Sequence, residues 1–315
     1  MNLKNIVKKY MPYYKWKSQI LYKFVEENEI KAENFFLCNY VNPMYLIEKN
    51  FHTVLFNELP ECISIKTVPY QAVFNVWDST YDLFKYIVEC GKYVYFLFDN
   101  NYFISAKERS IYPDKRSQLI CRYKNGVFDL VNSYNLGDGE NNLLHCSNNV
   151  MEKIFNTMTQ IYKNDLQLED DFFQICWFNK NKVDFDCNRL LNQIYSYINH
   201  SPKPFAIFGT TFEGNGNGIY DILSKTIDYH KVNIFLELCF HKRIMIWRYE
   251  TLRNKRIINE NKYLESILYH IFYKSQDAIS LFEEKDTTSI VSILNDIKCN
   301  ELEAFKIMCE LLERN

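Results

Sequence analysis

The cysteine at position 38 is the first residue whose chemistry and surroundings suggest catalysis. In NFFLCNYVNP it follows an aromatic pair, and Pro43 suits the first turn of a following helix. A thiol near the positive end of a helix has a lowered pKa and is a better nucleophile. Cys38 is therefore a candidate catalytic residue. Free cysteine is also among the most buried residue types, so a core thiol is the alternative.

A second group of candidates follows the apolar run KYVYFLFD, which is typical of a buried strand. Asp99 ends this run, and a carboxylate in such a place can have a shifted pKa and act as a general base. Tyr102 and Arg116 are candidate binding residues beside it, and Tyr123 is another. The alternative for Asp99 is a loop residue that turns or caps the chain.

The histidines and cysteines do not form a recognisable metal or redox motif. Six histidines are present, and those at positions 200, 230, 241 and 270 fall in predicted helical sequence, where histidine is usually a satisfied surface residue. The ten cysteines contain no C-x-x-C pair. We therefore predict free thiols, neither a zinc site nor a disulfide framework, and no cofactor.

Composition narrows the class of protein. The 315 residues are 47% hydrophobic and 17% aromatic, which predicts a compact folded chain. The formal charge of -2, with both signs interspersed, argues against a nucleic-acid binder. No apolar run reaches the length of a membrane span, and the sequence MNLKNIVKKY does not resemble a signal peptide. We expect a soluble cytoplasmic protein without a membrane partner.

Apolar periodicity predicts an α+β protein. The first half contains expected helices at 18–30 and 79–90, and Ser79 or Asp78 is expected to cap the second helix, which Gly91 ends. A strand is expected at 92–99 and a hairpin at 117–134 that turns at Asn125-Gly126. The second half is mostly helical, and FGTTFEGNGNGIYD is predicted to be a loop that caps a helix at Ile219. The polar segment NLGDGENN, or the acidic segment LQLEDD shortly after it, suggests a domain boundary. We therefore predict an α+β domain at 1–140 and a mostly helical domain at 141–315.

The segment CGKYVYFLFDNNYFISAKERSIYPDKRSQLICRYKNGVFDLVNSYN resembles a papain-like family typified by the N-terminal domain of butirosin biosynthesis protein H and by related proteins of nonribosomal-peptide gene clusters. The resemblance there is carried by Gly91, the strand 93–98, Asp99, Tyr102, Phe103, Leu119, Ile120 and Tyr123. In the helical half, GIYDILSKTID and ELCFHKRIMIWRYETL are similar to two helices of the family. The matching residues are Gly218, Ile219, His241, Lys242, Met245 and Arg248.

The resemblance implies a papain-like (cysteine-protease-like) fold with an antiparallel sheet, and acyl or peptidyl transfer from a carrier-protein thioester. The family's hairpin histidine falls at Arg116 or Ser117, and an arginine stays protonated and is no general base. The family's early cysteine has no counterpart between Met11 and Ile30. Asn132 is either a remnant of the residue that orients the imidazole or simply part of a turn.

Two functions follow from this resemblance. The first is an acyltransferase, or an enzyme that forms or hydrolyses amide bonds, which acts on an acyl- or peptidyl-carrier protein with a small peptide or acyl group as substrate. The second is a catalytically degenerate relative that binds or scaffolds a carrier protein or peptide, with its aromatic residues forming rigid binding walls.

Overall fold

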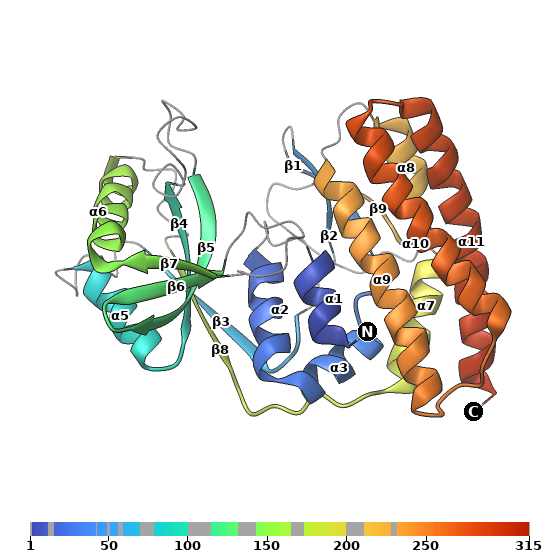
Figure 1. Cartoon of the computed structure of the whole chain (residues 1–315), viewed down its shortest axis with the longest axis horizontal. Coiled ribbons are helices and arrows are strands. Elements are labelled where there is room, and N and C mark those ends of the chain that lie inside the picture. Colours follow the sequence, from blue (N-terminus) through green and yellow to red (C-terminus); the bar gives the residue numbers. More distant parts are fainter. Residues whose placement is uncertain are drawn as a thin grey trace. The chain divides into compact units, whose positions relative to one another are not determined.

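The computed structural model describes residues 2–11, 16–41, 43–48, 51–55, 59–69, 79–99, 115–131, 143–164, 173–199, 211–227 and 232–314. The chain forms two compact units, each assembled from separate segments (Figure 1). Unit 1 contains Met1–Pro12, Asn28–Pro60 and Val183–Asn315, and unit 2 contains Tyr13–Glu27 and Glu61–Lys182. The predicted α+β class is confirmed, with an antiparallel sheet of six strands in unit 2 and most of the helices in unit 1.

Unit 2 is built on an open six-stranded sheet in the order β3-β8-β4-β5-β6-β7, and all neighbouring strands are antiparallel. Two strands that are distant in the sequence, β4 and β8, are neighbours in this sheet. The strands are β3 (Ile63–Val68), β4 (Tyr93–Asp99), β5 (Lys115–Lys124), β6 (Val127–Val131), β7 (Leu143–Ser147) and β8 (Phe173–Phe178).

Helices α5 (Thr80–Glu89) and α6 (Asn148–Asn164) cover one face of this sheet with an aromatic core. The ring of Phe84 lies 5.0 Å from that of Phe96 and 4.8 Å from that of Phe155, both edge-on. Edge-to-face contacts of this kind add to the stability that burial alone gives. The buried members of the core are Leu83, Phe84, Ile87, Val88, Val94, Phe96, Ile120, Phe128, Leu130, Cys146, Met151, Ile154 and Phe155.

Helix α2 (Trp16–Glu27) packs on the opposite face of the sheet. Val94 and Phe96 point into the α5–α6 core, and alternate residues of a strand face opposite sides. Tyr93 therefore faces α2, where its hydroxyl donates to Glu27. Burial, together with this bond, raises the pKa of Tyr93. The ring of Phe24 also contacts Phe178 at 5.6 Å.

The local turn signals predicted from the sequence are confirmed in unit 2. Asn125 and Gly126 adopt φ values of 51° and 79° and join β5 to β6, as a tight hairpin turn requires. Ser79 caps α5 by accepting from the Asp82 amide, and Gly91 ends that helix region with φ 71°.

The division of the chain differs from the boundary expected at residue 140. Strands β7 and β8 and helix α6 follow that position, yet they complete the sheet and core of unit 2. In β8, Cys176 pairs with Tyr93 of β4, and both neighbours of β8 come from the first half of the chain. The run FQICWF lacks the polar–apolar alternation of a half-buried strand, so periodicity alone did not identify it.

Unit 1 consists of helices and a small sheet. Helix α10 packs against both α9 and α11, α1 and α3 contact α9, and α7 and α8 contact α11 (Figure 1). Strand β1 pairs with β2 and β9. The elements are α1 (Leu3–Tyr10), α3 (Glu29–Cys38), β1 (Met44–Glu48), β2 (Phe51–Leu55), α7 (Cys187–Ile198), β9 (Thr211–Asn215), η3 (Gly216–Gly218), α8 (Ile219–Lys225), α9 (Val232–Asn254), α10 (Lys262–Glu283) and α11 (Thr287–Glu313).

Part of the predicted loop before Ile219 is a strand, β9, but the predicted cap is confirmed because Gly218 is the N-cap of α8. Gly216 has φ 53°, and a Cβ at this position would lie 2.5 Å from the carbonyl oxygen of Tyr197. We expect Gly216→Ala to lower the free energy of unfolding by about 2–3 kcal/mol, because it adds a steric overlap to an unfavourable backbone conformation.

Chemical denaturation followed by circular dichroism tests this expectation. Gly91→Ala is the matched control, since Gly91 has φ 71° but a Cβ added there would meet only open space. Gly91→Ala should lower the free energy of unfolding by only about 1–2 kcal/mol, which is the cost of the left-handed backbone conformation alone. Equal losses in the two variants would show that the contact with Tyr197 is not the cause.

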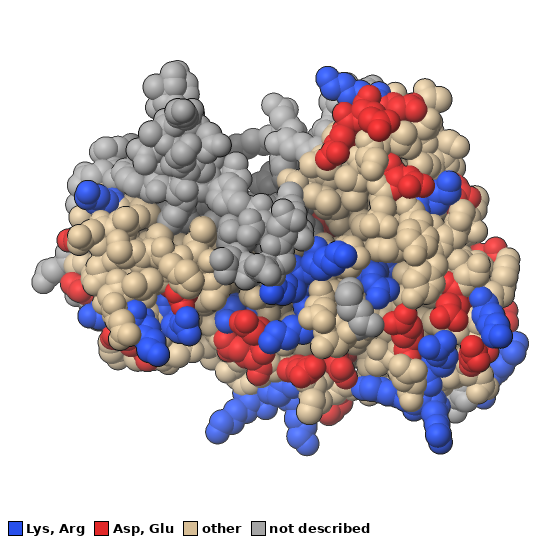
Figure 2. Space-filling model, viewed as in Figure 1, with Lys and Arg blue, Asp and Glu red and all other residues tan. Residues whose placement is uncertain are grey.

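On the face shown in Figure 2, lysine and arginine alternate with aspartate and glutamate over the described residues, as the interspersed sequence charges predict. Among the described helices, none combines the length and the apolar character needed to cross a bilayer.

Candidate functional site

Helix α9 carries an unusual number of polar side chains into the interior of unit 1. The helix is buried on nearly all sides because α1, α3 and α10 pack around it. Buried charges are costly unless they are paired and hydrogen-bonded, so their partners show what they do. The buried polar residues of α9 are Glu237, His241, Lys242, Arg243 and Arg248.

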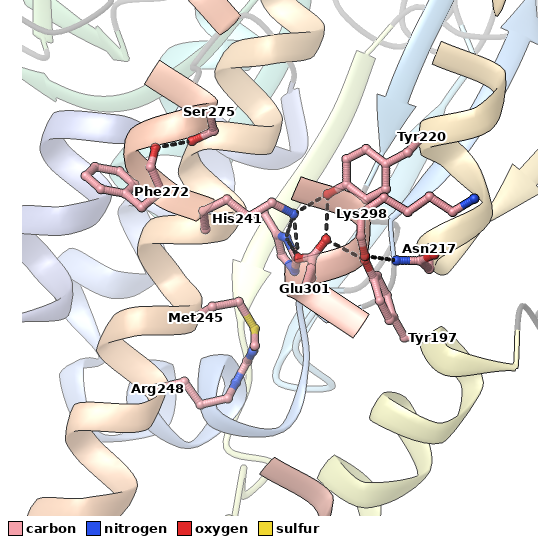
Figure 3. Close-up of polar contacts among 11 residues, drawn as sticks. Tyr197, Asn217, Tyr220, His241, Met245, Arg248, Phe272, Ser275, Lys298 and Glu301 are labelled. Atoms are coloured by element: carbon pink, nitrogen blue, oxygen red, sulfur yellow. Dashed lines mark hydrogen bonds and ion pairs between the residues drawn. The ribbon is translucent and has the colours of Figure 1, made fainter. Parts of the chain in front are cut away.

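Lys242 is the centre of a fully buried polar cluster. Figure 3 labels its partners Glu301, Tyr220 and His241. Lys242 Nζ donates to Glu301 Oε1 at 2.5 Å, to the Tyr220 hydroxyl at 2.5 Å and to His241 Nδ1 at 3.0 Å. The second carboxylate oxygen of Glu301 accepts from the Tyr220 hydroxyl at 2.6 Å and from the Tyr197 hydroxyl. The three donors of the ammonium group are therefore all used.

The cluster joins four helices, because Lys242 lies on α9, Glu301 on α11, Tyr220 on α8 and Tyr197 on α7. The short η3 turn is attached to the same region, since the buried Asn217 side chain donates to the Lys298 carbonyl of α11 at 2.9 Å (Figure 3).

Burial decides the protonation of these groups. Burial, with the charges of Lys242 and Arg248, lowers the pKa of His241 well below its usual value, so the imidazole is neutral. Burial and the Glu301 carboxylate raise the pKa of Tyr197 and of Tyr220, which stay protonated donors. Burial lowers the pKa of Lys242, while Glu301 opposes this change.

A lysine with a lowered pKa is a possible nucleophile or base in an enzyme. Lys242 and Glu301, however, have no solvent-exposed side-chain surface, and the ammonium donors are all occupied within the cluster. The cluster therefore joins α7, α8, α9 and α11 through buried side chains, and among the described residues it presents no exposed surface to a substrate.

Arg248 is the second polar centre of α9, and it binds the end of α3. Its guanidinium donates to the carbonyl oxygens of Phe36 at 2.9 Å, Leu37 at 3.0 Å and Asn39 at 2.5 Å. The last carbonyls of a helix lack intrahelical partners and carry a partial negative charge. A buried arginine supplies both hydrogen-bond donors and a positive charge to these carbonyls. Met245 Sδ accepts a further bond from Arg248 at 2.7 Å.

Cys38 is the last residue of α3, and it lies beside this arginine-capped end. The expectation that Pro43 begins a helix is wrong, because Pro43 directly precedes strand β1. Cys38 therefore lies at the negative end of its own helix. The aromatic pair before it is helical, since Ala32, Phe35 and Phe36 form a buried stripe at helical spacing.

The surroundings of the Cys38 thiol are those of a core cysteine. The residue is 1% exposed, and its sulfur donates to the Asp186 carbonyl at 3.5 Å and accepts from the Asp186 amide at 3.1 Å. Burial raises the pKa of Cys38, although the Asp186 amide and the charges of Arg248 and Arg189 act in the opposite direction. No imidazole contacts this sulfur among the side chains that the structure describes.

The other predicted site residues belong to unit 2. Asp99 is the last residue of β4, and Arg116 lies near the start of β5. In the backbone register Asp99 pairs with Lys115 and Arg116 with Phe98, so Asp99 and Arg116 are offset by one residue across the two strands and are not paired with each other. Their side chains, and the residues Tyr102 and Asn132 altogether, lie outside the described part of the structure.

Tyr123 lies at the hairpin end of β5, away from Arg116. Its ring packs on Phe128 at 4.6 Å, and its hydroxyl accepts from Asn148 Nδ2 at 3.2 Å. Hydrogen bonds from Tyr81 and Asn148 lower the pKa of Tyr123. The structure therefore gives this residue a position in the packing of α5 and α6 on the sheet.

The sequence singled out His241, Lys242, Met245 and Arg248. It missed Glu301 and Tyr220, which Lys242 binds, and Tyr197, which donates to Glu301. Glu301 lies 59 positions after Lys242 on a different helix. A glutamate in ELEAFKIMCELLE resembles any exposed charge of an amphipathic helix, and only its place between apolar positions indicates burial. No group of potential metal ligands occurs among the described side chains. Neither a family model nor a curated protein matches this chain.

Proposed function

We propose that this chain is a papain-related binding or scaffolding subunit of thiotemplated natural-product assembly, which holds an acyl- or peptidyl-carrier protein without forming an acyl-thioester on Cys38. The observation that carries the choice of binding over catalysis is the state of Cys38. Its thiol is buried at the C-terminal end of a helix with a raised pKa, whereas a catalytic cysteine needs an accessible thiolate.

The assignment to a papain-related family rests on the sequence resemblance, and two structural observations support it. Unit 2 has an antiparallel sheet, as the resemblance implies, with α2 packed on the face opposite to α5 and α6. In unit 1, the matched residues His241, Lys242 and Arg248 are buried and bonded. Positions with such structural roles are those that relatives of one fold would share.

Thiol reactivity tests the first part of the proposal. We expect Cys38 to remain unmodified when the native protein is treated with iodoacetamide, while the exposed Cys90 and Cys299 react. We also expect no acyl adduct on Cys38 after incubation with an acyl-loaded carrier protein. Mass spectrometry of peptides measures both results. An acyl adduct at Cys38 that disappears in Cys38→Ala would establish the transferase alternative instead.

Binding tests the second part. A carrier protein bearing its phosphopantetheine arm should bind the chain in isothermal titration calorimetry, and Cys38→Ala should bind with unchanged affinity. Carrier protein without the arm is the control that separates recognition of the protein surface from recognition of the arm. The proposal is wrong if a panel of acyl- and peptidyl-carrier proteins fails to bind in either form.

A further inference from the structure

Three polar side chains from neighbouring strands meet on the sheet of unit 2. Arg122 of β5 pairs with Asp129 of β6, which pairs with His145 of β7. One carboxylate oxygen of Asp129 accepts from Arg122 Nε at 2.5 Å, and the other lies 2.6 Å from His145 Nδ1. Phe128 and Leu130 point into the α5–α6 core, so Asp129 lies on the opposite face, the face on which α2 also packs.

The exposure of the three side chains is very unequal. The Asp129 side chain is 6% exposed, whereas those of Arg122 and His145 are 61% and 62% exposed. A cross-strand ion pair on a sheet surface usually leaves both partners in water and contributes little to stability. Here the buried carboxylate of Asp129 instead holds the exposed side chains of Arg122 and His145 in place through hydrogen bonds.

The bonds to Asp129 determine which donors remain for a ligand. An ionised carboxylate only accepts, so His145 Nδ1 carries a proton and Nε2 lies on the far side of the ring. Arg122 uses Nε for its bond, which leaves its two Nη groups. The same carboxylate therefore orients a guanidinium, which binds phosphoryl oxygens through its planar set of N–H groups, and an imidazole, whose Nε2 donates only when the ring is protonated.

We propose that Arg122 and His145 form an anion-binding site for a phosphoryl group, with Asp129 as the positioning residue that holds both donors. The inference does not depend on the proposed function. The ligand would be a phosphate monoester of a small molecule or a phosphodiester, and both present oxygens of the same chemistry.

The charges around the proposed site, and the protonation of His145, affect how tightly an anion binds there. Across the sheet face, α2 carries Lys23, Glu26 and Glu27, and Lys23 forms ion pairs with both glutamates. The hydrogen bond and charge of Asp129, with a smaller effect from the charge of Glu26, raise the pKa of Arg122. With His145 protonated, the Arg122–Asp129–His145 group gains one positive charge. An anion should therefore bind more tightly to the form with a protonated imidazole than to the form with a neutral one.

Nuclear magnetic resonance of the histidine ring protons provides the test on the full chain. Sulfate, which keeps its charge over the range from about pH 7.5 to about pH 6, serves as the probe for pH dependence. We expect a saturable shift of the His145 resonance and a higher affinity at the lower pH. Methyl phosphate and dimethyl phosphate then distinguish a monoester from a diester ligand, and binding of either one supports the site.

Two controls lie within the chain. His270 also pairs with a carboxylate, Asp296, at 2.7 Å, but that carboxylate accepts from Asn300 instead of an arginine, so its resonance should not respond. Arg122→Gln removes an exposed side chain without disturbing the core, and it should weaken binding roughly tenfold or more. Lys124→Gln removes an equal charge two residues further along β5 and should change the affinity less than about twofold.

The inference is overturned by either of two results. If His145 and His270 respond alike to every anion, the effect is one of ionic strength. If Lys124→Gln weakens binding as much as Arg122→Gln, the attraction is a general surface charge and not a built site. Circular dichroism of each variant confirms that the fold is retained.

Discussion

Glu301→Ala is expected to lower the free energy of unfolding of unit 1 by about 3–5 kcal/mol, because it leaves a buried ammonium group without its counter-charge. The change removes the carboxylate that accepts from Lys242, Tyr220 and Tyr197. All three donors are buried, and water does not reach them to replace the lost bonds. Chemical denaturation monitored by circular dichroism measures the loss.

An exposed ion pair on the same helix supplies the control. Lys298 of α11 pairs with Asp221 of α8 at 2.6 Å, with side chains 29% and 52% exposed. Lys298→Met should lower the free energy of unfolding by less than about 1 kcal/mol, since exposed ion pairs contribute little to stability. The double variant Lys242→Met with Glu301→Leu should recover much of the stability that Glu301→Ala loses, because no unpaired charge remains. If Glu301→Ala costs no more than Lys298→Met, the buried cluster does not hold the helices together.

The parts of the fold that were predicted from the sequence are those specified by local chemistry. The Asn125-Gly126 turn, the Ser79 cap and the run of β4 each depend on a few adjacent residues, and the structure contains all three. The long helices were also predicted, because their apolar residues recur at helical spacing over many turns.

The parts that were not predicted depend on pairing between distant segments. Strand β8 is a strand because it pairs with β3 and β4, which flank it in the sheet. A short, mostly apolar run such as FQICWF does not by itself distinguish a strand from a buried turn of helix. The same limit applies to the site. His241 and Lys242 were identified as adjacent residues, but Glu301 became part of the cluster only through the packing of α9, α8 and α11. Cys38 shows a related error, since its helix precedes it instead of following it.

Arg248→Met is the second change with a large expected effect, because one side chain satisfies the carbonyl oxygens of three residues. Without the guanidinium, the carbonyls of Phe36, Leu37 and Asn39 lose buried donors. Each unsatisfied buried group costs about 1–3 kcal/mol, so we expect unit 1 to lose about 3–5 kcal/mol of its free energy of unfolding. Arg248→Lys should recover only part of this loss, since an ammonium group does not reproduce the planar arrangement of donors.

The same variant should also change the chemistry of Cys38, which distinguishes capping of α3 from a general loss of core packing. Fraying of the last turn of α3 would expose the thiol, so Cys38 in Arg248→Met should react with iodoacetamide faster than in the unchanged protein. Arg243→Met is the matched control, because Arg243 lies on the same helix but its guanidinium contacts the ring of Phe272 at 6.0 Å. That variant should lose about 1 kcal/mol and leave the thiol protected. Equal thiol exposure in the two variants would mean that Arg248 does not act as the cap of α3, and the accessibility of Cys38 would then depend on the packing of α9 as a whole.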